Sequence, residues 1–195
     1  MGIRAEHRAQ MLGDIQSATL DLVEENGLDA TTIGHIAARV GVTERTFFRY
    51  YPSKEHALLP GLQDLIDVLV VLEARRTDPA GILADLLAEC RQLFAAEVER
   101  NYFRRISRLF AKDPDMTRVV ARYERDLAQA LSSALIQQGA LGAIQALLVA
   151  EVVTATWRIA WQALALREGA GVDADPVSLF DDTVRELGTL FPVRG

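Results

Sequence analysis

Apolar residues recur at intervals of three and four along nearly the whole chain, and no segment alternates apolar and polar residues for long. The first spacing places apolar side chains on one face of a helix, whereas alternation is typical of a strand. Glycine or proline separates the periodic segments, for example at Gly27, Gly41, Pro79 and Gly139. The pattern therefore predicts an all-α fold.

The predicted helices form a short group followed by a long group. The short group comprises residues 11–23, a helix capped by Thr32 and stopped by Gly41, and a helix capped by Thr43 that extends to about Tyr51. Another helix starts at Lys54, and longer segments then cover residues 80–110 (divisible near Asn101), 115–138, 141–168 and 177–191. We expect an N-terminal three-helix domain of residues 1–58 and a C-terminal helical bundle of residues 59–195.

Composition limits the compartment and the kind of site. The single Cys90 excludes an internal disulfide framework and a Cys-rich zinc site, and it fits a reducing compartment. The first ten residues lack the apolar core of a signal peptide, so we expect a cytoplasmic protein. The uncharged window 127–150 is interrupted by polar residues and glycines, and extending it brings in Glu151 and Arg158. Because a charge at bilayer depth costs roughly 2.5 to 3.5 kcal/mol, we expect a buried helix pair and no membrane partner.

Enzyme chemistry finds little support in the sequence. The only histidines are His7, His35 and His56, and none lies in an HExxH or Ser-His-Asp-like context. No glycine-rich phosphate loop is present. We expect no catalytic residues, no metal and no cofactor, although a helical enzyme or carrier is a third hypothesis.

The two short helices after residue 31 are the most informative unit. A short helix, a glycine turn and a second helix bearing arginine and tyrosine form the layout of a helix-turn-helix, whose second helix enters the major groove. Ile36, Phe47 and Tyr51 are placed to pack inward, which leaves Arg45 and Arg49 on the opposite side. Two short amphipathic helices also occur in ordinary bundles, where such arginines are only solvated charges.

Charge does not decide between these interpretations. The chain has a net charge of −6, and residues 1–58 hold six basic against eight acidic side chains. Such a balance argues against indiscriminate binding of polyanions through a cationic surface. DNA binding must therefore depend on where the individual cations lie.

Residues 31–55 read TTIGHIAARVGVTERTFFRYYPSKE, and this stretch resembles the N-terminal signature of the TetR family of transcriptional regulators. The likeness extends in order over residues 15–59. It implies a homodimer in which each N-terminal domain reads one half of a palindromic operator in double-stranded DNA. It also implies a helical C-terminal domain for ligand sensing and dimerisation.

The resemblance implies two sets of DNA contacts. Phosphates would meet the two helix caps, a tyrosine and the lysine of the next helix start, which are Thr32, Thr43, Tyr50 and Lys54. The base edges would lie nearest Arg45, Thr46 and Arg49. The chain departs from the family pattern at Glu44, where many relatives have a basic or small polar residue, at Arg45, where many have glycine or alanine, and at Phe48, which replaces a tyrosine. The base-reading details are therefore expected to differ from those of relatives.

Aromatic and basic residues in the predicted bundle are candidates to line a cavity for an organic anion. They are Phe94, Tyr102, Phe103, Arg105, Trp157, Arg158 and Trp161. The alternative is an ordinary core with a structural arginine paired to Glu97, Glu151 or another carboxylate. The last two helical segments are the candidate dimer interface, because segment 141–168 is apolar almost all round.

Two functional hypotheses follow from these features. The first is a dimeric repressor that leaves its palindromic operator when a small molecule fills the C-terminal domain. The second is a ligand-independent DNA-binding or co-regulatory protein whose C-terminal domain only dimerises or binds a protein partner. A C-terminal core packed fully by its own aromatic residues would favour the second.

Overall fold

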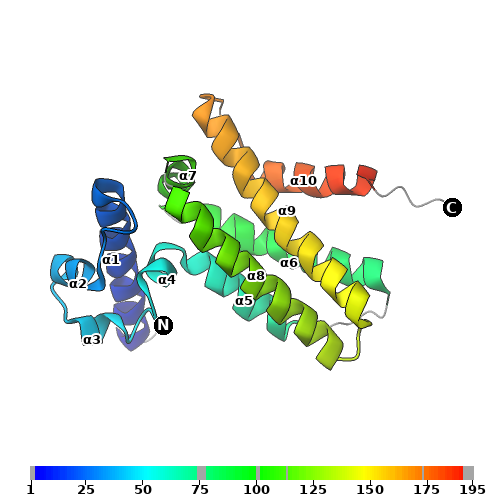
Figure 1. Ribbon diagram of the computed structural model, residues 1–195, viewed down its shortest axis with the longest axis horizontal. Helices are drawn as coiled ribbons and strands as arrows, with labels where there is room; N and C mark the ends of the chain where they lie inside the picture. Colours follow the sequence, from blue (N-terminus) through cyan, green and yellow to red (C-terminus); the bar gives the residue numbers. More distant parts are fainter. Residues whose placement is uncertain (1–2, 74–77, 100–101, 113, 173, 191–195) are drawn as a thin grey trace.

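The computed structural model describes residues 3–73, 78–99, 102–112, 114–172 and 174–190, and these residues form helices without strands. In chain order the helices are α1 (Ile3–Asn26), α2 (Ile33–Val40), α3 (Glu44–Phe47), α4 (Lys54–Leu58), α5 (Pro60–Val71), α6 (Pro79–Val98), α7 (Phe103–Lys112), α8 (Pro114–Gln137), α9 (Ala143–Gly169) and α10 (Pro176–Leu190). Figure 1 places α1 to α4 at one end of the molecule and α5 to α10 in a larger bundle beside them. The all-α prediction is confirmed.

The N-terminal helices pack around a small apolar core of their own. Its buried members are Ile15, Ala18, Leu22, Ile36, Phe47, Tyr51 and Ala57. Gly41 ends α2 in the left-handed conformation (φ 78°), which lets the next amide, that of Val42, donate to the carbonyl of Ala37 at 2.9 Å. The chain thereby turns sharply and brings α3 against α1 and α2.

The start of the first helix and the end of the third differ most from the predicted boundaries. Helix α1 begins at Ile3, before the predicted residue 11. The prediction missed this first part because residues 5–10 are exposed and carry no apolar periodicity. Helix α3 ends at Phe47, and helical turns continue to Tyr51, whose amide donates to the Phe47 carbonyl at 3.0 Å. The segment predicted as one helix is thus a short helix followed by turns.

The C-terminal bundle is organised around α9. Helices α8 and α9 run antiparallel, joined by a short turn, and α6, α7 and α10 also pack against α9 (Figure 1). Within the described residues α9 alone is long and apolar enough to cross a membrane. Its buried face, which includes Val153, Trp157 and Ala160, lies in the main core of the bundle. Burial among its neighbours accounts for the apolar composition on that side.

A second apolar cluster joins the two groups of helices. It combines Leu20, Val23 and Leu28 from α1 and the loop after it, Leu58 and Leu59 from the end of α4, and Ile106, Leu109 and Met116 from α7 and α8. We call this set the junction cluster. The expected domain boundary between residues 58 and 59 falls inside it, so the two parts share buried surface at that point.

Candidate functional site

The starts of α2 and α3 are held by threonine caps. Thr32 Oγ1 accepts a hydrogen bond from the His35 amide at 3.2 Å, and Thr43 Oγ1 accepts one from the Thr46 amide at 3.1 Å. The hydroxyls of Thr43 and Thr46 also lie 3.0 Å apart. Both cap residues are exposed, so the same threonines that fix the helix starts face solvent.

We call α3 and the turns that follow it, residues 44–51, the recognition segment. The two arginines of this segment face away from the core. Phe47 is completely buried between α1 and α2, whereas Arg45 and Arg49 on either side of it are exposed. Within the described residues neither arginine forms an ion pair or hydrogen bond, so both guanidinium groups are available to an external partner. Phe48 is also turned outward, with 53% of its surface exposed.

Tyr50 is half-buried and lies beside α1. The guanidinium carbon of Arg8 is 5.5 Å from the centre of the Tyr50 ring, a distance at which a cation and an aromatic face attract. This contact brings a third basic side chain to the recognition segment. Sequence periodicity could not identify it, because it depends on how α1 packs across the end of α3.

Lys54 has a structural role that the sequence did not reveal. Its ammonium group donates to the backbone carbonyls of Leu28 (2.7 Å) and Thr31 (2.8 Å), both in the loop between α1 and α2. The side chain therefore ties α4 to the start of the helix-turn-helix. An ammonium group has three hydrogens, so one remains beyond these two bonds.

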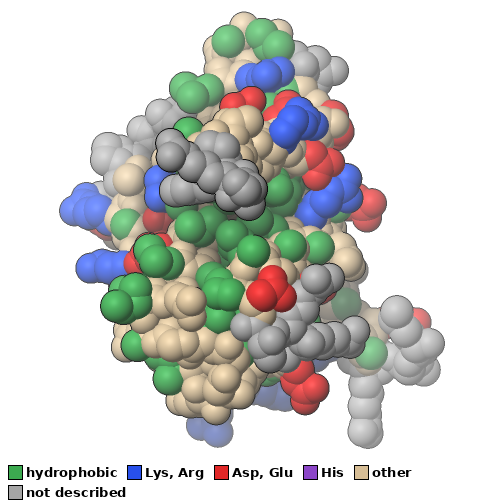
Figure 2. Space-filling view, turned by 90° about the vertical axis from the view of Figure 1, so that its right-hand side faces the viewer, with side chains coloured by type: hydrophobic (Ala, Val, Ile, Leu, Met, Phe, Trp, Pro, Cys, Tyr) green, Lys and Arg blue, Asp and Glu red, His purple; other side chains and the backbone are tan. Residues whose placement is uncertain are grey.

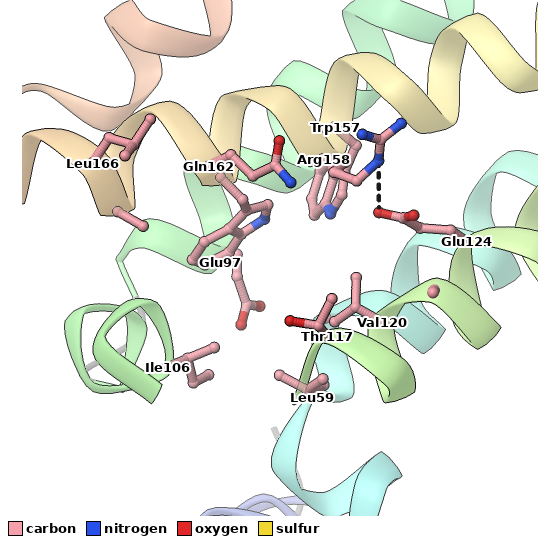
Figure 3. Close-up of a pocket in the computed structure, with 14 residues that line it drawn as sticks. Leu59, Glu97, Ile106, Thr117, Val120, Glu124, Trp157, Arg158, Gln162 and Leu166 are labelled. Atoms are coloured by element: carbon pink, nitrogen blue, oxygen red, sulfur yellow. Dashed lines mark ion pairs between the residues drawn. The ribbon is translucent and has the colours of Figure 1, made fainter. Parts of the chain in front are cut away.

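A pocket of about 730 Å³ opens in the C-terminal bundle between α8 and α9 (Figure 3). Helices α6 and α7 and the junction of α4 and α5 complete its wall. Of the seven residues predicted to bind a ligand, Trp157, Arg158 and Trp161 line it. The volume lies within the range of about 300 to 1,000 Å³ that small-molecule pockets occupy.

The other four predicted ligand residues do not line this pocket. Phe94 is fully buried behind the two indoles, with its ring centre 5.3 Å from that of Trp157 and 5.4 Å from that of Trp161. Tyr102 packs against the junction cluster. The side chain of Phe103 lies outside the described residues.

Arg105, which was expected to line the cavity, faces the N-terminal helices instead of the pocket. Its guanidinium donates to Asp21 at 2.6 Å and to Glu24 at 2.7 and 3.0 Å, both on α1. Hydrogen bonding to Glu24, with a further bond to Asp21, raises the pKa of Arg105 above its already high usual value. The residue is a charged clamp between α7 and α1.

Arg158 combines the two roles that the sequence left open. It lines the pocket, and its Nε lies 3.2 Å from Oε1 of Glu124 on α8 (Figure 3). The distance is that of an ion pair, but the alignment is not that of a hydrogen bond, and Glu124 Oε1 is buried with no hydrogen-bond partner among the described residues. Burial raises the pKa of Glu124, and the charge of Arg158 opposes that rise.

Several lining residues were not expected to line a pocket, and Glu97 was named only as a possible partner of an arginine. Glu97 is buried and points into the pocket from α6, and Thr117 and Gln162 add polar groups from α8 and α9 (Figure 3). These residues lie far apart in the chain and belong to no motif. Only a buried glutamate within an apolar helix could have marked Glu97 in advance.

Leu59 and Ile106 belong to both the pocket wall and the junction cluster. A molecule in the pocket would therefore touch side chains that pack directly on α1. No group of three or more metal-ligating side chains occurs in the part of the chain that the structure describes.

Comparison with known proteins places these features in context. Residues 15–59 match the family of bacterial regulatory proteins, tetR family. The HTH-type transcriptional regulator RutR of Escherichia coli K12 is 35% identical over 100 residues, which are 51% of this chain and 45% of RutR, so the match spans less than half of that relative.

Two solved structures share the fold over nearly the whole chain. A TetR-family transcriptional regulator from Syntrophomonas wolfei has a TM-score of 0.60 and 17% identity, with 97% of this chain and 100% of that chain covered. The fatty acid degradation regulator FadR from Bacillus halodurans has a TM-score of 0.53 and 15% identity, with 94% and 96% covered. The family match thus covers the helix-turn-helix, and the structural likeness extends over both groups of helices.

Proposed function

We propose that this chain is a transcriptional regulator of the TetR family, and that it acts as a cytoplasmic, dimeric repressor released from a palindromic operator by a small molecule. The family consists of regulators rather than enzymes. We further propose that residues 1–58 bind DNA and that residues 59–195 bind the ligand and dimerise. The pocket between α8 and α9 favours this function over a ligand-independent regulator, since the bundle is not filled by its own aromatic residues.

The proposed DNA contacts use the exposed side of the helix-turn-helix. Arg45, Thr46 and Arg49 would read base edges, because a guanidinium fork matches the acceptors of guanine. Thr32, Thr43, Tyr50 and Lys54 would meet phosphates. Arg45 and Arg49 are exposed and have no partners among the residues that the structure describes, which supports the first set. The hydrogen that Lys54 retains after its two carbonyl bonds is the one available to a phosphate.

An exposed apolar stripe on α9 supports the proposed homodimer. Ile144, Leu148 and Ile159 follow one side of the helix and are between 45% and 78% exposed. The pocket-lining tryptophans lie on another side of the same helix. Figure 2 looks onto the end of the molecule away from the helix-turn-helix and shows hydrophobic side chains gathered near the middle of that face. A second copy of the stripe would cover apolar surface that a monomer leaves in water.

One observation carries the proposal of ligand control: Leu59 and Ile106 line the pocket and also hold the N-terminal helices through the junction cluster. A ligand that fits one position of these side chains better than another favours the matching position of α4 and α1. Two recognition helices must lie about 34 to 36 Å apart to enter successive major grooves. A coupling of roughly 1 to 3 kcal/mol is sufficient to lower operator affinity several-fold or more.

The test begins with selection of bound fragments from random DNA, followed by fluorescence anisotropy with the selected fragment. We expect a palindrome, and we expect Arg49→Ala to weaken binding by about 1 to 3 kcal/mol without unfolding the protein. Arg125→Ala is the matched control, because that arginine on α8 is exposed and bonds to the Ala121 carbonyl of its own helix. Failure to select any sequence, or unchanged affinity in both Arg49→Ala and Tyr50→Phe, would contradict the proposed interface. A metabolite screen by thermal shift then identifies compounds that also release the fragment.

A further inference from the structure

The indole nitrogen of Trp157 is an unsatisfied hydrogen-bond donor in the pocket wall. Trp157 is 4% exposed, and its Nε1 is buried without a partner among the described residues. Figure 3 shows this nitrogen turned from α9 toward the pocket. A buried donor without an acceptor is unfavourable, so an occupant that supplies an acceptor to this nitrogen gains affinity.

The aromatic wall is fixed from behind. Phe94 contacts Trp157 and Trp161 edge to face, and it also packs on Phe180, with ring centres 5.4 Å apart. These contacts restrict the indoles, so the Trp157 donor keeps one direction. A preorganised donor selects for the position of the acceptor as well as for its presence.

The charges of the pocket disfavour an anion. Two carboxylates, those of Glu97 and Glu124, border it, and both residues are buried or half-buried. The guanidinium of Arg158 lies at ion-pair distance from Glu124, so its charge is already engaged within the protein. An organic anion, which the aromatic and basic sequence pattern favoured, would enter beside two groups of its own charge.

We propose that the effector of this pocket is an uncharged, flat apolar molecule with a carbonyl-type acceptor for Trp157 Nε1, and that carboxylates of the same shape are rejected. This inference rests on the proposed function, because it concerns the same pocket. The indoles would cover the flat part of the molecule, and an N–H donor beside the carbonyl would suit the unsatisfied Oε1 of Glu124. An amide attached to an aromatic ring has all three features.

Three probes with the same ring system separate these features: naphthalene, 2-naphthamide and 2-naphthoate. Isothermal titration calorimetry on the full chain at pH 7.5 measures their affinities. We expect 2-naphthamide to bind at least about tenfold more tightly than 2-naphthoate, with naphthalene weaker than the amide. Glu124→Gln should raise the affinity for 2-naphthoate several-fold, whereas Glu186→Gln, an exposed glutamate on α10, should leave it unchanged.

Trp157→Phe keeps an aromatic ring and removes the donor. We expect this variant to lose about five- to tenfold in affinity for 2-naphthamide and to bind naphthalene within about twofold of the parent, a difference that a general packing defect would not produce. Trp161→Phe is the matched control, and it should affect the amide and naphthalene alike.

Three results would overturn the inference: equal or tighter binding of 2-naphthoate, an unchanged affinity of Trp157→Phe for 2-naphthamide, or no binding of any probe. Operator binding is measured separately and without probes. A protein that binds its operator yet prefers the carboxylate would refute the ligand class and leave the regulatory function standing. A protein that binds no DNA would refute the function whatever the probes do.

Discussion

The guanidinium of Arg105 on α7 donates to the carboxylate of Asp21 on α1 at 2.6 Å and thereby ties the ligand-binding bundle to the DNA-binding helices. The neighbouring Glu24 accepts two further bonds from the same side chain. Leu59 and Ile106 pack the apolar junction cluster between the same two parts. The connection between the halves is thus both charged and apolar.

Removing the Arg105 clamp should weaken this connection. Arg105→Ala is expected to lower the free energy of unfolding by about 1 to 3 kcal/mol, since hydrogen bonds between charged groups are lost and two carboxylates remain side by side. Urea denaturation monitored by circular dichroism measures the change. Arg108→Ala on the same helix, where the side chain is exposed, should change stability by less than about 0.5 kcal/mol. Equal effects in the two variants would contradict the clamp.

Lys54 should affect both stability and DNA binding. Lys54→Met removes the two bonds to the loop carbonyls, so we expect unfolding to become easier by about 1 to 3 kcal/mol. If the third hydrogen meets a phosphate, the salt dependence of operator binding should also fall by about one unit. Denaturation and anisotropy across a salt series test the two roles separately. A variant as stable as the parent would rule out the structural one.

His56 should make the protein less stable in mild acid. Its ring packs edge-on against Tyr123 with ring centres 5.1 Å apart, and burial lowers the pKa of His56 below the ordinary value of 6.5. The unfolded chain then binds a proton more readily than the folded one. This contribution to stability is therefore complete above pH 6.5 and is lost as the pH falls toward the folded pKa. Other groups that influence His56 are Ser53, Glu55, Gln63 and Arg122.

The measurement is the melting temperature between pH 7.5 and 5.5. His56→Gln should flatten the decline over this range, whereas His35→Gln, at an exposed position of α2, should leave it as in the parent. The same slope in His56→Gln and the parent would show that another group controls the acid sensitivity.

The α9 stripe predicts a specific defect in assembly. Leu148 is 60% exposed in the single chain, and Leu148→Arg should place a charge in the proposed interface without disturbing the core. We expect sedimentation velocity to change from a dimer to a monomer and operator affinity to fall with it. Val71→Arg is the control, because Val71 on α5 is 74% exposed and lies outside the stripe. A Leu148→Arg dimer would place the interface elsewhere.

Much of the helix-turn-helix could be predicted because its signals are local. Thr32, Gly41 and Thr43 act within one turn of themselves as caps and stops, and Phe47 faces inward by helical spacing alone. The pocket offered only a partial signal: Trp157, Arg158 and Trp161 were expected to line a cavity, but the rest of its wall comes from other helices that are distant in sequence. Arg105 illustrates the limit: its aromatic neighbours in sequence suggested a cavity, but its partners lie more than 80 residues away on α1. Tertiary packing, which periodicity does not encode, decided its role.

Trp157 and Trp161 are the only two tryptophans in the chain, and both lie in the pocket wall. The tryptophan fluorescence, excited at a wavelength where tyrosine does not absorb, therefore originates at the place where the effector would bind. Occupancy can be followed without a dye, in the same cuvette in which labelled operator reports its release. The order of the two events, filling and dissociation, then becomes directly observable in time.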